Sequence, residues 1–76
     1  MITVKLYGLL RIESGIKERQ IEAACIKDVW KDLTDQGISE KELKACLILI
    51  NGKSANKRSV LHDGDVVQLM SPVAGG

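Results

Sequence analysis

The segment Cys46-Leu47-Ile48-Leu49-Ile50-Asn51-Gly52 decides the fold of this 76-residue chain. Five apolar residues follow one another without interruption, and Asn-Gly is a preferred dipeptide of tight hairpin turns. A continuous apolar run is typical of a strand that is buried on both faces. We therefore place residues 46–50 inside a sheet, and we expect a short return strand over residues 54–56.

Two further strands are predicted near the start of the chain. Residues 2–7 alternate apolar and polar side chains, which indicates a half-buried strand. Residues 17–22 are rich in charge and suit a sheet edge, where charges discourage pairing with other chains. We expect these two strands to form a hairpin, with residues 8–15 as a connector that turns at Gly15.

The last strand is predicted over residues 66–70. Asp63-Gly64-Asp65 has the residues of a turn just before it. Val60 and Leu61 are expected to return to the core ahead of this turn. This strand then leads directly into the last six residues of the chain.

One main helix is expected between the second and third strands. Its apolar stripe repeats at i, i+3, i+4 and i+7, and Gly37 suits the left-handed position after its last turn. Trp30 is the largest side chain of the stripe, and we expect it to lie in the core beneath the sheet. Residues 39–42 have capping-box spacing and predict one short helical turn. The stripe consists of Ile26, Val29, Trp30 and Leu33.

The order β-β-α-β-β-β predicts an α+β fold. One main helix must cover one face of a mixed sheet of about five strands, because a single layer cannot bury its apolar side alone. A first hairpin, a crossing helix and a last strand beside the first are the β-grasp arrangement. Residues 1–70 are predicted to form this domain, and residues 71–76 a flexible, extended C-terminal tail.

Composition excludes several classes of function. The net charge is +1, so no broad field for nucleic acid or a membrane is expected. One Trp, one Tyr and no Phe argue against base stacking on an exposed sheet. Neither a signal-peptide pattern nor an apolar run of membrane-spanning length is present, and a cytoplasmic location is expected.

A metal site is not expected either. Cys25, Cys46 and His62 are too few and too badly spaced for zinc. The two cysteines are interpreted as small core residues rather than as a disulfide. Asp63 and Asp65 are interpreted as turn residues, since two carboxylates cannot supply the six or more oxygens that calcium requires. His62 is expected in a solvated loop.

The tail carries the chemically informative pattern. Gly75 and Gly76 have no Cβ atoms, so they can enter a narrow channel and leave the final carbonyl open to a nucleophile. Pro72 fixes its own φ and favours an extended residue before it. Six such residues reach about 20 Å. A Gly-Gly end also arises by chance in about 0.5% of chains, so the pair alone does not decide function.

Two segments resemble MoaD-like proteins, the small, sulfur-carrying subunits of molybdopterin synthase. They belong to the MoaD/ThiS group of ubiquitin-like carriers, which implies a ubiquitin-like β-grasp fold. The Pro-Val-Ala-Gly-Gly ending favours the molybdopterin branch over the thiamine branch. Two departures are that Ser71 stands where the family often has a proline, and that residues 68–70 lack the family's frequent Phe. The segments are Val4–Arg11, with Gly15 after it, and Leu61–Val67 followed by Ser71–Gly76.

The resemblance implies a chemistry that partners perform on the tail. An ATP-using adenylyltransferase, similar to ubiquitin-activating enzymes, would adenylate Gly76. Sulfur from a donor protein would then displace AMP and leave a C-terminal thiocarboxylate, which the large subunit of molybdopterin synthase uses. Gly75 would provide access, while Pro72, Val73 and Ala74 would guide the arm into its channel. The chain itself is expected to bind no cofactor.

Three alternatives and one surface remain open. The chain could be a ThiS-like carrier of another pathway, a protein modifier that forms an isopeptide bond with lysine, or a non-covalent binding module that uses its sheet face. Leu9, Leu10 and Leu69 form a candidate docking patch for the large subunit. The same three residues are equally compatible with an ordinary core.

Overall fold

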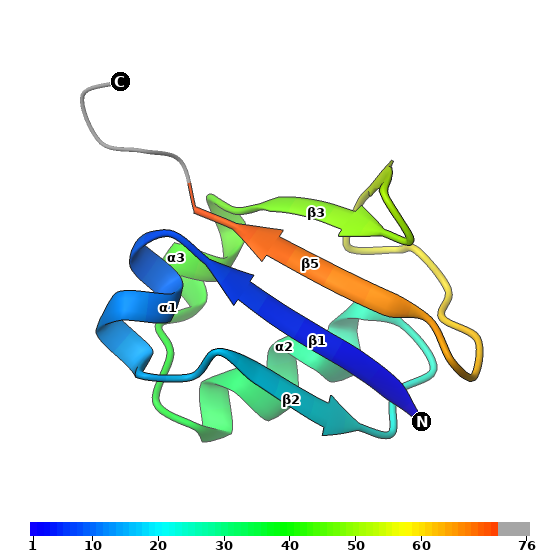
Figure 1. Ribbon diagram of the computed structural model, residues 1–76, viewed down its shortest axis with the longest axis horizontal. Helices are drawn as coiled ribbons and strands as arrows, with labels where there is room; N and C mark the ends of the chain where they lie inside the picture. The colour runs from blue at the N-terminus through cyan, green and yellow to red at the C-terminus, as the bar shows by residue number, and fades with distance from the viewer. Residues whose placement is uncertain (72–76) are drawn as a thin grey trace.

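Five strands and three helices make up residues 1–71, the part of the chain that the computed structural model describes (Figure 1). Residues 72–76 lie outside the described part. The elements in chain order are β1 Ile2–Tyr7, α1 Leu9–Ser14, β2 Glu18–Ile21, α2 Ile26–Asp35, α3 Glu40–Lys44, β3 Leu47–Ile50, β4 Lys53–Ala55 and β5 Val66–Met70.

The strands form one mixed sheet in the order β2-β1-β5-β3-β4. The central pair, β1 and β5, is parallel, whereas the β1–β2, β3–β5 and β3–β4 pairs are antiparallel. The first hairpin and the last strand beside the first are therefore confirmed. At one end of the sheet Met70 pairs with Tyr7 on one side and with Leu47 on the other.

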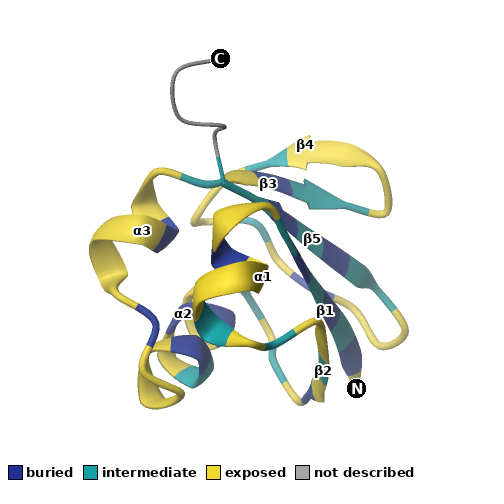
Figure 2. Cartoon of the chain, turned by 60° about the vertical axis from the view of Figure 1, so that its left-hand side comes forward, coloured by how far each residue is buried: buried dark blue, intermediate teal, exposed yellow. Residues whose placement is uncertain are grey.

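The core lies between the inner face of the sheet and the helices, which all cover that same face (Figure 2). Trp30 is 6% exposed and lies in this core, as predicted. The helical stripe is buried over its whole length, and it meets inward-pointing residues of the three central strands. The principal members are Ile26, Val29, Trp30 and Leu33 from α2, and Ile2, Val4, Leu6, Ile48, Val67 and Leu69 from the sheet.

Helix α2 ends as the sequence predicts. Gly37 has φ 97°, and its N–H donates to the Thr34 carbonyl at 3.0 Å. The N–H of Ile38 donates to the Leu33 carbonyl at 3.1 Å. This pair of bonds is a Schellman motif, and the buried side chains of Ile38 and Leu33 supply its apolar component. The short turn predicted next is confirmed as α3.

Two turns are tied together at the end of the sheet where β3 finishes and β5 begins. Asn51 has φ 51° in the Asn-Gly turn, and its Nδ2 donates to Asp65 Oδ1 at 2.8 Å. The Val66 N–H donates to Asn51 Oδ1 at 2.9 Å, and the His62 N–H donates to Asp65 Oδ2 at 2.8 Å. The backbone bond from His62, followed by the Asn51 bond, lowers the pKa of Asp65.

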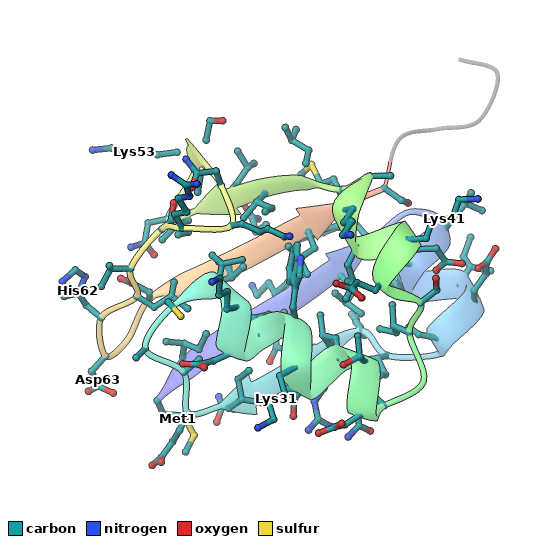
Figure 3. The ribbon with its side chains drawn as sticks, turned by 180° about the vertical axis from the view of Figure 1, so that it is seen from behind. Met1, Lys31, Lys41, Lys53, His62 and Asp63 are labelled. Atoms are coloured by element: carbon teal, nitrogen blue, oxygen red, sulfur yellow. The ribbon has the colours of Figure 1, made fainter. Side chains whose placement is uncertain are left out.

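The amino terminus is held at the same end. The Met1 amino group pairs with the Asp63 carboxylate, and the Gly64 N–H donates to the Met1 carbonyl at 2.8 Å. Figure 3 shows Met1, His62 and Asp63 near one another at this end, with Lys41 of α3 at the other. The interpretation of residues 63–65 as a turn is confirmed, and His62 lies in an exposed loop as expected.

The predicted connector over residues 8–15 is wrong in one respect, because residues 9–14 form helix α1. The helix has only six residues, which is too short for a periodic apolar stripe to be recognised. Gly15 ends it in the left-handed conformation, and its N–H donates to the Arg11 carbonyl at 3.0 Å. The turn expected at Gly15 is thus confirmed.

The prediction that residues 46–50 are buried on both faces is also wrong. β3 is an internal strand, since it lies between β5 and β4. Ile48 points into the core, but Leu47 is 54% exposed because the helices cover only the other face. A similar correction applies to Val60, which is exposed, whereas Leu61 is buried as expected.

Candidate functional site

The tail begins at one end of the sheet, directly after β5. Ser71 follows Met70, which lies between the last residue of β1 and the first residue of β3. Helix α1 starts two residues after β1 and lies beside this point (Figure 1). The predicted tail residues Pro72, Val73, Ala74, Gly75 and Gly76 lie outside the described residues, so their roles stay predictions.

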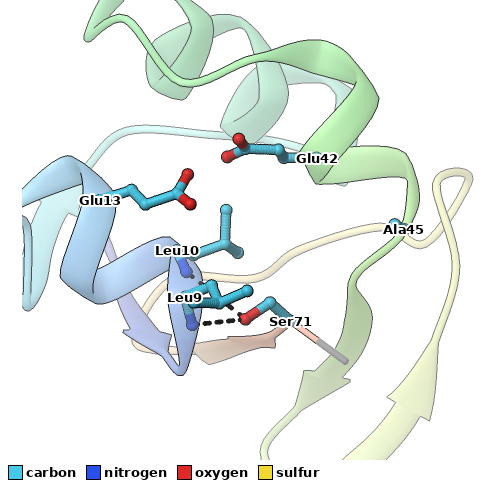
Figure 4. Close-up of a pocket in the computed structure, with 6 residues that line it drawn as sticks. All are labelled: Leu9, Leu10, Glu13, Glu42, Ala45 and Ser71. Atoms are coloured by element: carbon cyan, nitrogen blue, oxygen red, sulfur yellow. Dashed lines mark hydrogen bonds between the residues drawn. The ribbon is translucent and has the colours of Figure 1, made fainter. Parts of the chain in front are cut away.

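Ser71 is bonded to the start of α1. The Leu9 N–H donates to Ser71 Oγ at 2.7 Å, and the Leu10 N–H points to the same oxygen at 3.4 Å (Figure 4). The Ser71 hydroxyl has the Tyr7 carbonyl as its acceptor, at 3.4 Å. Ser71, the first residue of the predicted tail, is therefore held by hydrogen bonds to α1 and to the end of β1.

The docking patch predicted from Leu9, Leu10 and Leu69 is not formed by those three residues. Leu9 is 44% exposed, but Leu10 and Leu69 are 1% and 0% exposed. Leu69 alternates with outward-pointing residues along β5 and packs inward with Val67. The alternative interpretation, that these leucines belong to the core, holds for two of them.

A different apolar surface lies at this end, on the face of the sheet that no described helix covers. We call it the open-face patch, and it consists of Tyr7, Leu47 and Met70. These residues are adjacent across three strands, because Met70 pairs with both of the others. Leu47 is exposed, and Tyr7 and Met70 are half-buried. Strict alternation with the core residues could have revealed the patch, but the apolar run of β3 concealed its outward positions.

A small hollow separates α1 from α3 beside Ser71. Its volume is about 170 Å³, and its apolar walls come from Leu9, Leu10 and Ala45. The carboxyl groups of Glu13 and Glu42 face one another across it (Figure 4). A hydrogen bond with Glu13 is the main cause that raises the pKa of Glu42, and burial and the Glu13 charge act in the same direction. The described residues 1–71 form no ion pair with either carboxylate.

The Cys46 thiol has little nucleophilic character. Both cysteines are free and half-buried. The Cys46 thiol donates to the Glu42 carbonyl at 3.1 Å, and burial raises its pKa to about 11. Because only a thiolate is a good nucleophile, Cys46 is unreactive at neutral pH.

Residues 1–71 contain neither a cluster of metal ligands nor a membrane-spanning helix. Among these residues, no group of three or more His, Cys, Asp or Glu side chains could hold a metal ion. The helices of this part of the chain are all too short or too polar to cross a membrane.

Comparison with known proteins identifies a matching family and similar solved structures. The sequence model of the ThiS family matches residues 4–76. A search of curated protein sequences finds no match. A chain in the complex of subunits 1 and 2 of the molybdopterin-converting factor from Helicobacter pylori is similar to this chain, with 28% sequence identity. The match covers 99% of this chain and 97% of that chain, with a TM-score of 0.75.

Two archaeal structures are also similar. Small archaeal modifier protein 1 of Methanosarcina acetivorans has 28% identity and a TM-score of 0.78, with coverage of 99% of this chain and 95% of that chain. SAMP1 of Haloferax volcanii has a TM-score of 0.84 at 21% identity, with coverage of 99% and 98%, and it supports the fold alone.

The fold and these likenesses define a ubiquitin-like β-grasp protein. With a family match over residues 4–76, the chain belongs to the ThiS family of ubiquitin-like sulfur carriers.

Proposed function

We propose that this protein carries sulfur as a thiocarboxylate on Gly76 and acts as the small subunit of molybdopterin synthase. The observation that carries the proposal is the family match, which runs through Gly75 and Gly76. The resemblance of the Pro-Val-Ala-Gly-Gly ending to MoaD-like proteins supports the molybdopterin pathway. The similarity to a chain of the Helicobacter pylori molybdopterin-converting factor complex supports the same assignment.

The chemistry requires an activating partner, because a free carboxylate is a poor acyl donor. A carboxylate oxygen of Gly76 attacks the α-phosphate of ATP, and pyrophosphate leaves. Hydrosulfide supplied by the sulfur donor then attacks the acyl carbon, AMP leaves, the sulfur loses its proton to water, and a C–S bond replaces the broken C–O bond of the adenylate. The small side chains of the tail let this carbon enter a channel, and no acid, base or bound cofactor of the chain takes part.

The open-face patch is the surface that we assign to the large subunit. Leu47 exposes an apolar side chain at the tail end of the sheet, and Tyr7 and Met70 extend this surface beside it. A partner that receives the tail is brought close to this end. Apolar and aromatic side chains are typical of the buried centre of such interfaces.

Intact-mass measurement tests the sulfur-carrier function. The purified chain is incubated with ATP, a ubiquitin-activating-like adenylyltransferase and a sulfur donor. The expected product is heavier by the mass difference between sulfur and oxygen. The matched control is a chain that lacks Gly75 and Gly76, which should show no change. A wild-type chain that gains no mass with any candidate enzyme contradicts the proposal.

A protein-modifier function is the second candidate. It is favoured by the similarity to small archaeal modifier protein 1 of Methanosarcina acetivorans. The same activated Gly76 would then form an isopeptide bond with a lysine amine. Affinity capture from cells under denaturing conditions separates the two functions, because a pure carrier yields no conjugates.

A further inference from the structure

Helix α1 has no cap of its own, yet its first N–H groups are occupied. The first N–H groups of any helix lack partners inside the helix, and a Ser, Thr, Asp or Asn just before the helix usually supplies one. Here that position is Gly8, which has no side chain. The oxygen comes instead from Ser71, which is 62 positions away from Leu9 in the sequence.

The approach of Ser71 to α1 depends on the glycine. A Cβ atom built on Gly8 would lie 2.6 Å from Ser71 Oγ and 3.4 Å from the Ser71 carbonyl oxygen. Gly8 also has φ 67°, a conformation that other residues rarely adopt. The absent side chain and the positive φ therefore both allow the hydroxyl to reach the Leu9 N–H.

These contacts hold the chain at the point where the tail begins. The five residues after Ser71 reach about 17 Å when extended. A rotation of about 30° at Ser71 would therefore displace the tip of an extended tail by roughly 9 Å. A hydrogen bond that restrains Ser71 therefore strongly limits the positions that the Gly76 carboxyl group can reach.

We propose that Ser71 is a positioning residue, whose bond to the start of α1 sets the direction in which the tail leaves the domain. The role rests on the proposed function, because it is the activating enzyme that benefits from a tail directed in advance. Restraint before binding lowers the ordering cost that binding would otherwise incur. The sites of the chemistry remain Gly75 and Gly76, and Ser71 acts only through the path of the chain.

Three variants test the role. Ser71→Ala removes the hydroxyl, Ser71→Thr keeps a hydroxyl at the same place, and Gly8→Ala fills the space that Ser71 occupies. Ser54→Ala, in the exposed strand β4, is the matched serine control. ATP–pyrophosphate exchange with the activating enzyme then gives KM and kcat for each chain.

We expect Ser71→Ala to raise KM about fivefold, the scale of one net hydrogen bond. The value of kcat should change much less, since the reacting groups are unaltered. Gly8→Ala should raise KM in the same way, whereas Ser71→Thr and Ser54→Ala should stay within about twofold of the wild type. A merely structural role would lower the melting temperature of Ser71→Ala with KM unmoved, and this result would overturn the proposal.

A second measurement needs no enzyme. NMR order parameters of the backbone amide of residue 71 and hydrogen exchange of the Leu9 amide report directly on the hydrogen bond between the Leu9 N–H and Ser71 Oγ. In Ser71→Ala the order parameter should fall and the Leu9 exchange should accelerate, and Ser71→Thr should restore both. Unchanged values in Ser71→Ala would overturn the positioning role whatever the enzyme does. Failure of the wild-type chain to become adenylated, with the NMR changes present, would instead contradict the proposed function.

Discussion

The two ends of the sheet are built differently. Where β3 finishes and β5 begins, side chains and backbone are bonded to one another through Asn51, Asp65 and the amino terminus. Where β5 finishes, the surface presents an exposed leucine and two facing carboxyl groups, and a single serine hydroxyl joins β5 to α1. At the first end Asn51, Asp65 and the amino terminus have partners within the domain, whereas the second end leaves an exposed leucine and two carboxyl groups that a partner could contact.

This difference suggests that the start of β5 contributes mainly to stability and that its end contributes mainly to partner binding. An apolar side chain in water and two carboxyl groups that repel one another contribute little to folding or oppose it. Their position beside Ser71 places them where a protein that handles the tail must approach. We therefore expect substitutions at the bonded end to change stability, and substitutions at the tail end to change binding.

The largest loss of stability should come from Asn51→Ala. The change removes the bonds to Asp65 Oδ1 and the Val66 N–H and places alanine at φ 51°. We expect a loss of about 2 kcal/mol in the free energy of unfolding, from bonds of about 1 kcal/mol each. Urea denaturation measures it, with the exposed Lys53→Ala as control. Lost sulfur loading in a chain that remains folded would contradict the separation of the two ends.

At the tail end, Leu47→Ser should change binding and not stability. Leu47 is exposed, so the free energy of unfolding should move by no more than about 0.5 kcal/mol. Affinity for the large subunit of molybdopterin synthase should fall about tenfold, or about 1.4 kcal/mol. Calorimetric titration measures it. Val60→Ser, another exposed apolar position, is the control, and equal affinity of Leu47→Ser and the wild type would exclude the open-face patch as the interface.

Acid should weaken the bonded end. The pKa of Asp65 is lowered in the folded chain, so the folded state releases this proton more readily than the unfolded state. The resulting stabilisation is present above about pH 4 and disappears as the pH falls through the lowered value. Asp65→Asn should therefore be less stable at pH 7, with a difference that shrinks on acidification. Thermal melts between pH 7 and pH 2 test this, and a constant difference would contradict it.

The smallest expected effect has the opposite sign. The pKa of Glu42 is raised mainly by its hydrogen bond with Glu13, so the folded state holds the proton more tightly. This contribution is greatest below the ordinary glutamate pKa of about 4.3 and is lost as the pH rises through the raised value. Glu13→Gln should slightly stabilise the protein at pH 7 and flatten the dependence in this range. Glu22→Gln is the control, and a Glu13→Gln protein less stable than wild type would contradict the account.

Part of the candidate site could be read from local pattern and part could not. The turn at residues 63–65 is confirmed, because Asp-Gly-Asp is a short, distinctive turn sequence, whereas the roles of residues 72–76 stay predictions. The assignment of Leu10 and Leu69 to a docking patch is wrong, because both are buried. Residue type alone does not distinguish a core leucine from an exposed one. The Glu13–Glu42 pair was missed because the two residues lie on separate helices, and only the packing of α1 beside α3 brings them together.

The sequence by itself determined the strands over residues 2–7 and 66–70, the helix with Trp30 and the Asn-Gly hairpin. Periodicity and turn chemistry act over a few residues, so they are legible without a structure. Only the tertiary structure decided that residues 9–14 form a helix, that Leu47 faces outward and that Ser71 accepts a hydrogen bond from the start of α1. Each of these depends on contacts between segments that are distant in the chain, as in the bond from the Leu9 N–H to Ser71.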